Sequence, residues 1–277
     1  MSGQTPQGGS SSNEQAFRSF IAVLGFALWI IFLVPPVASW SQQYEYAQAI
    51  QFCVFAVLTP ALLVAGAPWR WLGLASREPH LTDADGKVVS PRRPLFVDRL
   101  AIARTNRPGH RRAYVLVTVF SLTTIFWRVS PVVDSLVRHP WLAIIESLCL
   151  VAVGVILWLD LIESPPLKPS TTRPYRIGMA TASMWVVWVL AYLLGQSNSS
   201  WYPAFHHVAG RGVSLSADQQ LISGAMWLLT AGAFLPVVFW NLVHWLQSEE
   251  DPNDELYRLV RQEKTLGSLE SNGDSNG

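Results

Sequence analysis

Six long apolar segments restrict the fold of this chain more than any other feature of its sequence. A helix needs about 20 mostly apolar residues to cross the ~30 Å hydrocarbon core of a membrane. The alternation of apolar and polar residues that is typical of a membrane barrel is absent. In hydrocarbon, backbone polar groups must find partners within the protein, which favours helices. The sequence therefore predicts an all-α, polytopic membrane bundle of about six transmembrane helices. The segments cover residues 16–34, 46–67, 113–133, 140–161, 177–194 and 220–246.

The composition agrees with a membrane protein. Only 14% of the residues are charged, whereas about a quarter are charged in a typical soluble domain. The 13 tryptophans suit the two interfaces between lipid and water. A net charge of +1 gives no general case for nucleic-acid binding. The two cysteines lie in apolar segments, which excludes the disulfide framework of a small secreted protein.

These segments divide the chain into three predicted parts. Residues 1–15 are rich in Gly, Ser and Gln and are predicted to form a disordered tail. Residues 16–246 form the predicted bundle, and residues 247–277 form a mostly disordered second tail. The first apolar segment has little basic charge before it and no small-residue cleavage site after it, so we expect a retained span rather than a signal peptide.

The basic residues predict how the bundle is oriented. Ten of the chain's 20 Lys and Arg residues lie in the loop 69–112. Most of the others fall in the loop 162–176 and in the two tails, which six spans place on the same side. Positive residues stay on the cytoplasmic side, so both termini are predicted to be inside. This leaves Arg128, Arg138 and Arg211 on the outer side.

The basic loop 69–112 is expected to attract anionic lipid at the cytoplasmic face. Within it, residues 94–104 mix apolar side chains with arginines. This stretch is either a solvated loop or a short helix lying on the membrane surface.

Polar residues on the outer side make a candidate site. Glu146 lies about two turns inside an apolar segment, where an ionisable residue is costly. It is either functional or buried between helices with a Tyr or Gln as its partner. Asp218 precedes the last apolar segment and is expected to cap that helix. The predicted polar site consists of Glu45, Gln51, Glu146, Tyr202, Asp218, Gln219 and Gln220.

Three sulfur atoms suggest a metal site. Cys53, Cys149 and Met226 are expected ~12 Å below the outer interface, from the rise of 1.5 Å per helical residue. Soft sulfur ligands select Cu(I). The alternative is that all three are packing residues. Glu146 and Cys149 stand three apart and are expected to share a helix face.

No enzyme motif is present. The sequence lacks G-x-S-x-G, H-E-x-x-H and a P-loop, so we predict that the protein is not an enzyme.

Three stretches together resemble the CtaG-like cytochrome c oxidase assembly factors, best known with caa-type oxidases. The first is AIQFCVFAVLTPALLVAGAPWRWL, which ends in the family's Gly-x-Pro pattern. The second, IIESLCLVAVGVILWLDLIESPP, resembles the family's Leu-Glu-His helix and keeps Glu146, Gly154 and Trp158. The third is Asp-Gln-Gln at 218–220, followed by Gly224, Met226 and Trp227.

The resemblance implies a non-enzymatic assembly factor for a haem–copper oxidase in the bacterial inner membrane, with oxidase subunits as partners. It also implies support for copper insertion on the outer face. Family members usually carry histidines where this chain has Ala47, Gln51, Ala143 and Ser147. Either the sulfur residues and Glu146 replace those ligands for Cu(I), or the chain is a metal-free accessory subunit. A small-solute transporter using Glu146 is a third alternative.

Overall fold

A computed structural model describes residues 9–70, 110–164, 167, 169–196, 201–207, 212 and 214–249. Regular structure in this part of the chain is helical, which confirms the predicted all-α membrane bundle. Most of the basic loop 69–112 lies outside the described residues. The stretch 94–104 and the tail beyond residue 249 also lie outside them.

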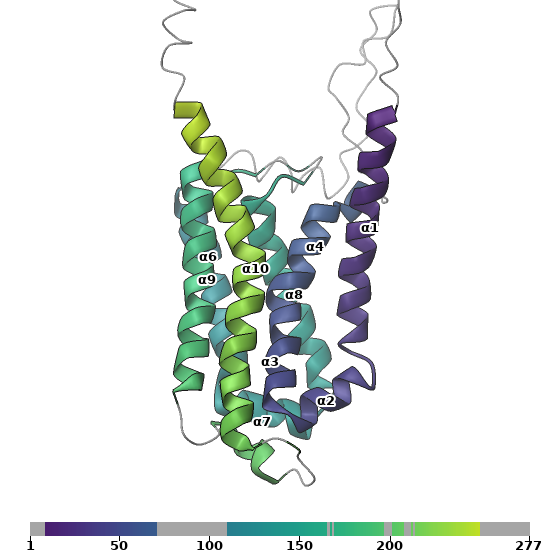
Figure 1. Ribbon diagram of the computed structural model, residues 1–277, viewed down its shortest axis with the longest axis vertical. Helices are drawn as coiled ribbons and strands as arrows, with labels where there is room; N and C mark the ends of the chain where they lie inside the picture. The colour runs from purple at the N-terminus through teal and green to yellow at the C-terminus, as the bar shows by residue number, and fades with distance from the viewer. Residues whose placement is uncertain are drawn as a thin grey trace, which may run out of the picture.

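The first half of the bundle contains two spanning segments joined by a short helix (Figure 1). Helix α1 leads away from the end at which the described chain begins, and α2 turns the chain before α3 leads back. The second segment has three parts, because a π-helical turn, η1, separates α3 from α4. The bounds are α1 Gly9–Ile31, α2 Val37–Gln43, α3 Glu45–Cys53, η1 Val54–Leu58, α4 Thr59–Gly66 and the 3₁₀ turn η2 Pro68–Arg70.

The second half adds three long helices and one bent pair. Helices α6 and α7 are bent by 60° relative to each other at Val129, which has extended backbone just before the Pro131 turn. The described chain thus has five helices long and apolar enough to cross a membrane, or six with the bent pair. The bounds are α6 His110–Arg128, α7 Ser130–Arg138, α8 Leu142–Leu161, α9 Arg173–Gly195, the 3₁₀ turn η3 Pro203–His207 and α10 Leu215–Glu249.

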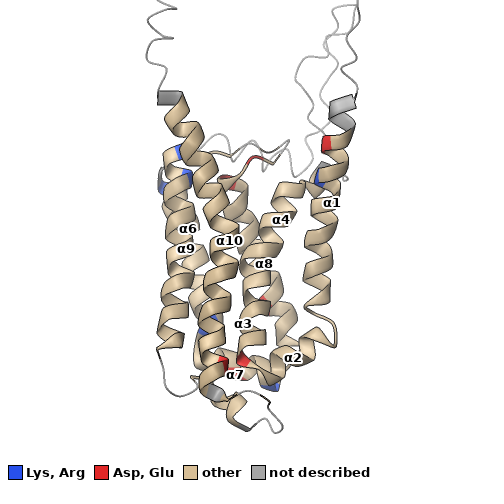
Figure 2. Cartoon of the chain, viewed as in Figure 1, with Lys and Arg blue, Asp and Glu red and all other residues tan. Residues whose placement is uncertain are grey.

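The start of α1 and the end of α10 lie at the same end of the bundle, here called the terminal end (Figure 1). Helices α6 and α9 also begin there, whereas α3, α8 and α10 begin at the opposite end. Helix α1 begins at Gly9 rather than at residue 16, so the predicted N-terminal tail was too long. Charged residues of the described chain gather mainly near the two ends (Figure 2).

Glycines set the closest approaches between helices. A Cβ on Gly154 would lie 2.5 Å from Pro60 Cγ and 2.9 Å from the backbone oxygen of Ala56. A Cβ on Gly66 would lie 2.4 Å from the backbone nitrogen of Ala22. The missing side chains therefore let α8 pack on η1 and α4, and let α4 pack on α1. The π-helical turn η1 directly precedes Pro60, which cannot donate the regular helical hydrogen bond.

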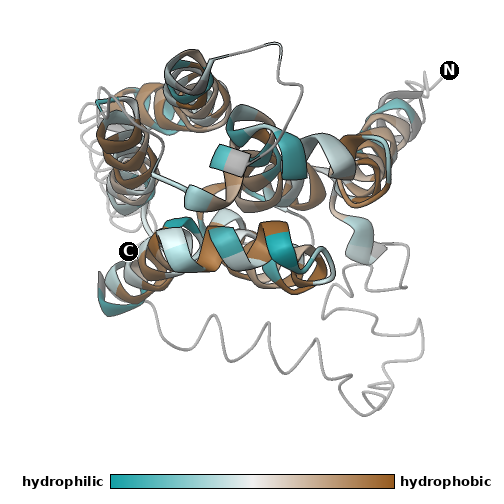
Figure 3. Ribbon diagram, turned by 90° about the horizontal axis from the view of Figure 1, so that it is seen from below, coloured by the Kyte–Doolittle hydropathy of each residue, from teal (hydrophilic) through white to brown (hydrophobic). Residues whose placement is uncertain are grey.

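The pattern of burial is inverted relative to a soluble protein. Large apolar side chains are exposed along the long helices, among them Phe20, Leu122, Leu148 and Leu228. Much of the helical ribbon is brown, the colour of apolar residues, when the bundle is viewed along its axis (Figure 3). Charged and amide side chains are instead buried at several points inside the bundle. This arrangement fits helices surrounded by lipid.

Candidate functional site

Asp218 ties two helix starts together at the end opposite the termini. Its carboxylate accepts hydrogen bonds from the backbone N–H groups of Glu45 at 3.0 Å and Tyr46 at 2.9 Å. These are the first two residues of α3, so Asp218 caps α3, and the expectation that it caps its own helix was wrong. At the start of α10, the hydroxyl of Ser214 accepts from the N–H of Ala217 instead. An acidic group also suits the positive dipole end of α3.

Arg128, the last residue of α6, is buried next to this junction. Its guanidinium donates to the side-chain oxygen of Gln48 and lies 4.9 Å from the centre of the Phe52 ring and 5.6 Å from that of Tyr202. Nε and Nη2 of Arg128 have no hydrogen-bond partner among the described residues. The sequence had placed Arg128 in the outer group of basic residues, without indicating that it enters the protein. A buried cation held largely by aromatic faces leaves hydrogen-bonding capacity unused.

Tyr202 closes one side of the Arg128 site. Its hydroxyl donates a hydrogen bond of 3.2 Å to the backbone oxygen of Arg128. Burial is the largest influence on this phenol and raises its pKa above the usual value, so Tyr202 remains a hydrogen-bond donor at neutral pH. Asp134 of α7 holds the same segment in place, because its carboxylate accepts from the N–H of Ala204 at 3.0 Å.

Glu146 lies beside a cavity of about 300 Å³ formed near the opposite end by α2, α3, α7 and α8. Its side chain is buried, and its Oε1 has no hydrogen-bond partner in the described part of the chain. Gln48 lines the same cavity, and its Nε2 has no hydrogen-bond partner among the described residues. The positive charge of Arg128 is close enough to interact electrostatically with Glu146. Gln51 also lines the cavity, but it donates to the backbone oxygen of Phe32 at 2.6 Å. Two residues that line the cavity therefore each hold a buried polar atom, one an acceptor and one a donor, with no hydrogen-bond partner among the described residues.

The other predicted polar residues lie at different depths. Glu45 and Gln219 are buried, and neither the oxygen nor the nitrogen of the Gln219 amide has a partner among the described residues. Gln220, the next residue, is exposed. The structure thus places Glu45, Gln219 and Asp218 inside the bundle, and Gln220 at its surface.

The three sulfur residues do not form a common buried set. Cys53 and Met226 are fully buried, whereas Cys149 is exposed. Glu146, three residues earlier on the same helix, is buried, so the two residues differ in burial despite their close spacing. In the described ranges no group of three or more His, Cys, Asp or Glu residues could hold a metal ion. Cys149 therefore lies apart from the buried Cys53 and Met226, and a Cu(I) site stays a prediction.

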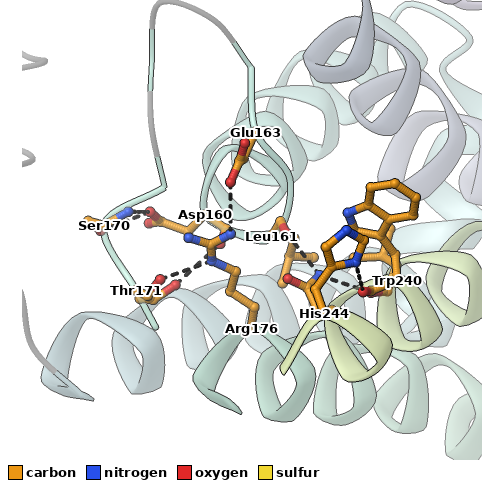
Figure 4. A network of polar contacts seen from close by, with 10 residues as sticks. Asp160, Leu161, Glu163, Ser170, Thr171, Arg176, Trp240 and His244 are labelled. Carbon is orange, nitrogen blue, oxygen red and sulfur yellow. Dashed lines mark hydrogen bonds and ion pairs between the residues drawn. The ribbon is translucent and has the colours of Figure 1, made fainter. Parts of the chain in front are cut away.

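Sequence reasoning also missed a buried acid at the terminal end of α8. This residue, Asp160, has a fully buried side chain. One carboxylate oxygen accepts from Arg112 at 2.8 Å, and the other accepts from the N–H and the hydroxyl of Ser170 (Figure 4). The serines and threonines at 170–172, close to Asp160 in sequence, were a signal for a polar junction. This acid fixes the α8–α9 connection to α6.

The comparison with protein families agrees with the motifs that lie at these positions. The family model of the cytochrome c oxidase caa3 assembly factor (Caa3_CtaG) matches residues 8–248. This chain belongs to that family. No curated protein and no solved structure matches the chain.

The fold gives physical roles to residues of the Caa3_CtaG motifs. Asp218 joins α10 to α3, and Gly154 permits the contact between α8 and Pro60. Trp158 stacks on Phe234 with ring centres 4.9 Å apart. Trp227 stacks on Trp188 at 4.5 Å. In this Caa3_CtaG chain, several motif residues therefore hold neighbouring helices in contact at different depths of the bundle.

Proposed function

We propose that this Caa3_CtaG protein supports oxidase assembly from the outer side of the bacterial cytoplasmic membrane. Arg18 lies in the first half of α1, Arg111 and Arg112 begin α6, and Arg173 and Arg176 begin α9. All five lie toward the terminal end, which supports a cytoplasmic location for that end. The cavity and the Asp218 junction then face the outer compartment. The basic loop 69–112 is proposed to lie against anionic lipid on the cytoplasmic side.

The observation that carries the proposal is the unsatisfied polar wall of the cavity near Glu146. Burying a polar group without a partner is unfavourable, so such groups mark a place where a ligand or protein segment can complete the hydrogen bonds. The Glu146 carboxyl group can accept and Gln48 can donate, which matches a peptide backbone or an amide side chain. We infer that a segment of an oxidase subunit docks here during assembly. The protein acts as a scaffold and performs no catalysis.

A metal-free scaffold is favoured over copper delivery because Cys149 lies apart from the buried pair Cys53 and Met226. A Cu(I) site would have to use Cys53 and Met226 with ligands other than Cys149. A measurement of bound copper therefore distinguishes a metal-free scaffold from a copper-delivering assembly factor. A copper-delivering protein would lose bound copper when Cys53 is changed to serine.

Deletion of the gene in its own host tests the assembly role. The amount of oxidase is measured from haem spectra of the membranes, and its activity from oxygen consumption with a reduced electron donor. We expect less assembled oxidase in the deletion strain and recovery with the wild-type gene. Full amounts of active oxidase without this protein would overturn the proposal.

A further inference from the structure

A second cavity lies at the terminal end, remote from the Glu146 cavity. It has a volume of about 470 Å³ and is bordered by α1, α9, α10 and the end of α8. Its polar lining includes three arginines from two different helices, together with one acid, Glu163, and two neutral polar residues, Asn241 and His244. The arginines are Arg18, Arg173 and Arg176. Its other side is apolar and includes Val237 and Trp240 of α10. A basic rim beside an apolar wall is the pattern that an anionic amphiphile requires.

The arginines of α9 occupy an unfavourable position for cations. Arg173 is the first residue of α9 and Arg176 lies three residues later, so both are in the first turn. The positive end of the helix dipole disfavours cations there, and like charges three apart on a helix repel each other. No acidic residue lies in this first turn, and no side chain caps it. An external anion would relieve both sources of repulsion.

The internal partners of these arginines are few. Arg176 donates from Nε to the backbone oxygen of Thr171 at 2.9 Å and has a long ion pair of 3.8 Å with Glu163 (Figure 4). The Glu163 side chain is 71% exposed, which weakens that pair. Arg173 has no hydrogen bond or ion pair among the described residues. Arg18 is paired with Glu14 at 3.0 Å within α1. The cavity therefore keeps an excess of positive charge with free donors.

The apolar wall continues onto the lipid-facing surface of α10. Trp240 is 65% exposed, and Phe239 and Val243 beside it are also exposed. The rings of Trp240 and His244 are in contact in a tilted arrangement, with ring centres 4.3 Å apart (Figure 4). Tryptophan prefers the depth at which head groups meet acyl chains. A ligand that reaches both the arginines and this surface must have an anionic head and a hydrocarbon tail.

From this geometry we propose that the cavity between α1, α9 and α10 binds one anionic phospholipid. Its phosphate pairs with Arg173 and Arg176, and an acyl chain lies along Val237 and Trp240. Bound in this way, the lipid bridges α9 and α10 at the cytoplasmic interface. The site is separate from the Glu146 cavity and does not depend on the proposed assembly role.

Lipid binding is tested on the full chain purified in a neutral detergent and stripped of lipid. Phosphatidylglycerol, phosphatidylcholine and glycerol 3-phosphate are added separately at a fixed ionic strength. Native mass spectrometry counts bound molecules, and the melting temperature reports stabilisation. We expect one retained phosphatidylglycerol per chain with a raised melting temperature. Phosphatidylcholine and glycerol 3-phosphate are expected to give neither effect.

Arg173→Gln is the principal variant, because Arg173 makes no hydrogen bond or ion pair among the described residues that its loss would break. Retention of phosphatidylglycerol should fall at least fivefold in Arg173→Gln and further in the double variant with Arg176→Gln. Arg138→Gln, which removes an exposed arginine at the opposite end, is the matched control and should retain the lipid fully. The melting temperature of each variant without lipid verifies its fold.

Three results would overturn the proposal. Equal retention of phosphatidylcholine would show that only the hydrocarbon is recognised. Equal stabilisation by glycerol 3-phosphate would show a site for soluble phosphate rather than for a lipid. Unchanged lipid retention in Arg173→Gln, or equal losses in Arg173→Gln and Arg138→Gln, would show general attraction to basic protein instead of a site.

Discussion

Asp218 Oδ1 accepts a hydrogen bond of 2.9 Å from the backbone N–H of Tyr46, a residue 172 positions earlier in the chain. The contact is buried on the Asp218 side and joins the start of α10 to the start of α3. An internal cap supplied by a distant helix fixes two segments at once. It also explains physically why an acidic residue precedes a long apolar helix.

Replacement of Asp218 by alanine should lower stability by about 2 kcal/mol, because two N–H groups of α3 lose a charged acceptor. The change is measured as a lower melting temperature in detergent. Ser214→Ala, which removes the exposed cap of α10, is the comparison and should have a smaller effect. Equal effects of the two changes would contradict a special role for the junction between α3 and α10.

Gly154→Ala should destabilise the bundle by about 1–3 kcal/mol through overpacking. The added methyl group would meet Pro60 and the backbone oxygen of Ala56 at distances shorter than van der Waals contact. Gly178→Ala, on the exposed side of α9 with no atom within 4 Å of the new Cβ, is the control. It should be neutral or slightly stabilising. A melting temperature unchanged by Gly154→Ala would show that α8 and α4 are not closely packed.

Asp160 and Arg112 should behave as a coupled pair. Asp160→Asn removes the charged acceptor of a 2.8 Å hydrogen bond and is expected to cost about 2 kcal/mol. Because both changes break the same contact, the double variant with Arg112→Gln should cost less than the sum of the two single changes. Melting temperatures of the four proteins give the coupling. Additive losses would show that the contact contributes nothing.

Cys149→Ser should leave the copper content of the purified protein unchanged, because Cys149 is exposed while Cys53 and Met226 are buried. Copper per chain is measured by atomic spectroscopy after purification under reducing conditions. Cys53→Ser is measured in parallel, since Cys53 is the only one of the two cysteines inside the bundle. Loss of bound copper in Cys149→Ser would restore the three-sulfur site that the sequence suggested.

The number of spans was predictable because it depends only on the length and hydrophobicity of each segment. The rotation of each helix was not, because it depends on contacts between helices. Cys149 illustrates this difference. Its depth could be estimated from the rise per residue, but only the packing of α8 shows that it is exposed and Glu146 is buried. A spacing of three residues allows two side chains to share a face without requiring equal burial.

The partners of the buried polar residues could not be predicted from the sequence either. Asp218 was identified as a capping residue from its position before an apolar segment, but the helix that it caps could not be read from the sequence. Arg128 follows an apolar run, and its distant partners Gln48, Phe52 and Tyr202 come from two other segments. Local patterns specify the chemistry of such residues. Tertiary packing selects their partners.

The most direct test of the central claim uses Glu146→Gln in a strain that lacks the chromosomal gene. This change keeps the shape of the side chain and replaces one carboxyl oxygen with an NH2 group, whereas Cys149→Ser serves as a control on the exposed side of the same helix. The measurement is assembled oxidase per unit of this protein, from haem spectra and immunoblots. We expect at least a threefold loss with Glu146→Gln and none with Cys149→Ser, at equal protein levels. Wild-type amounts of oxidase with Glu146→Gln would contradict a role of the cavity in oxidase assembly.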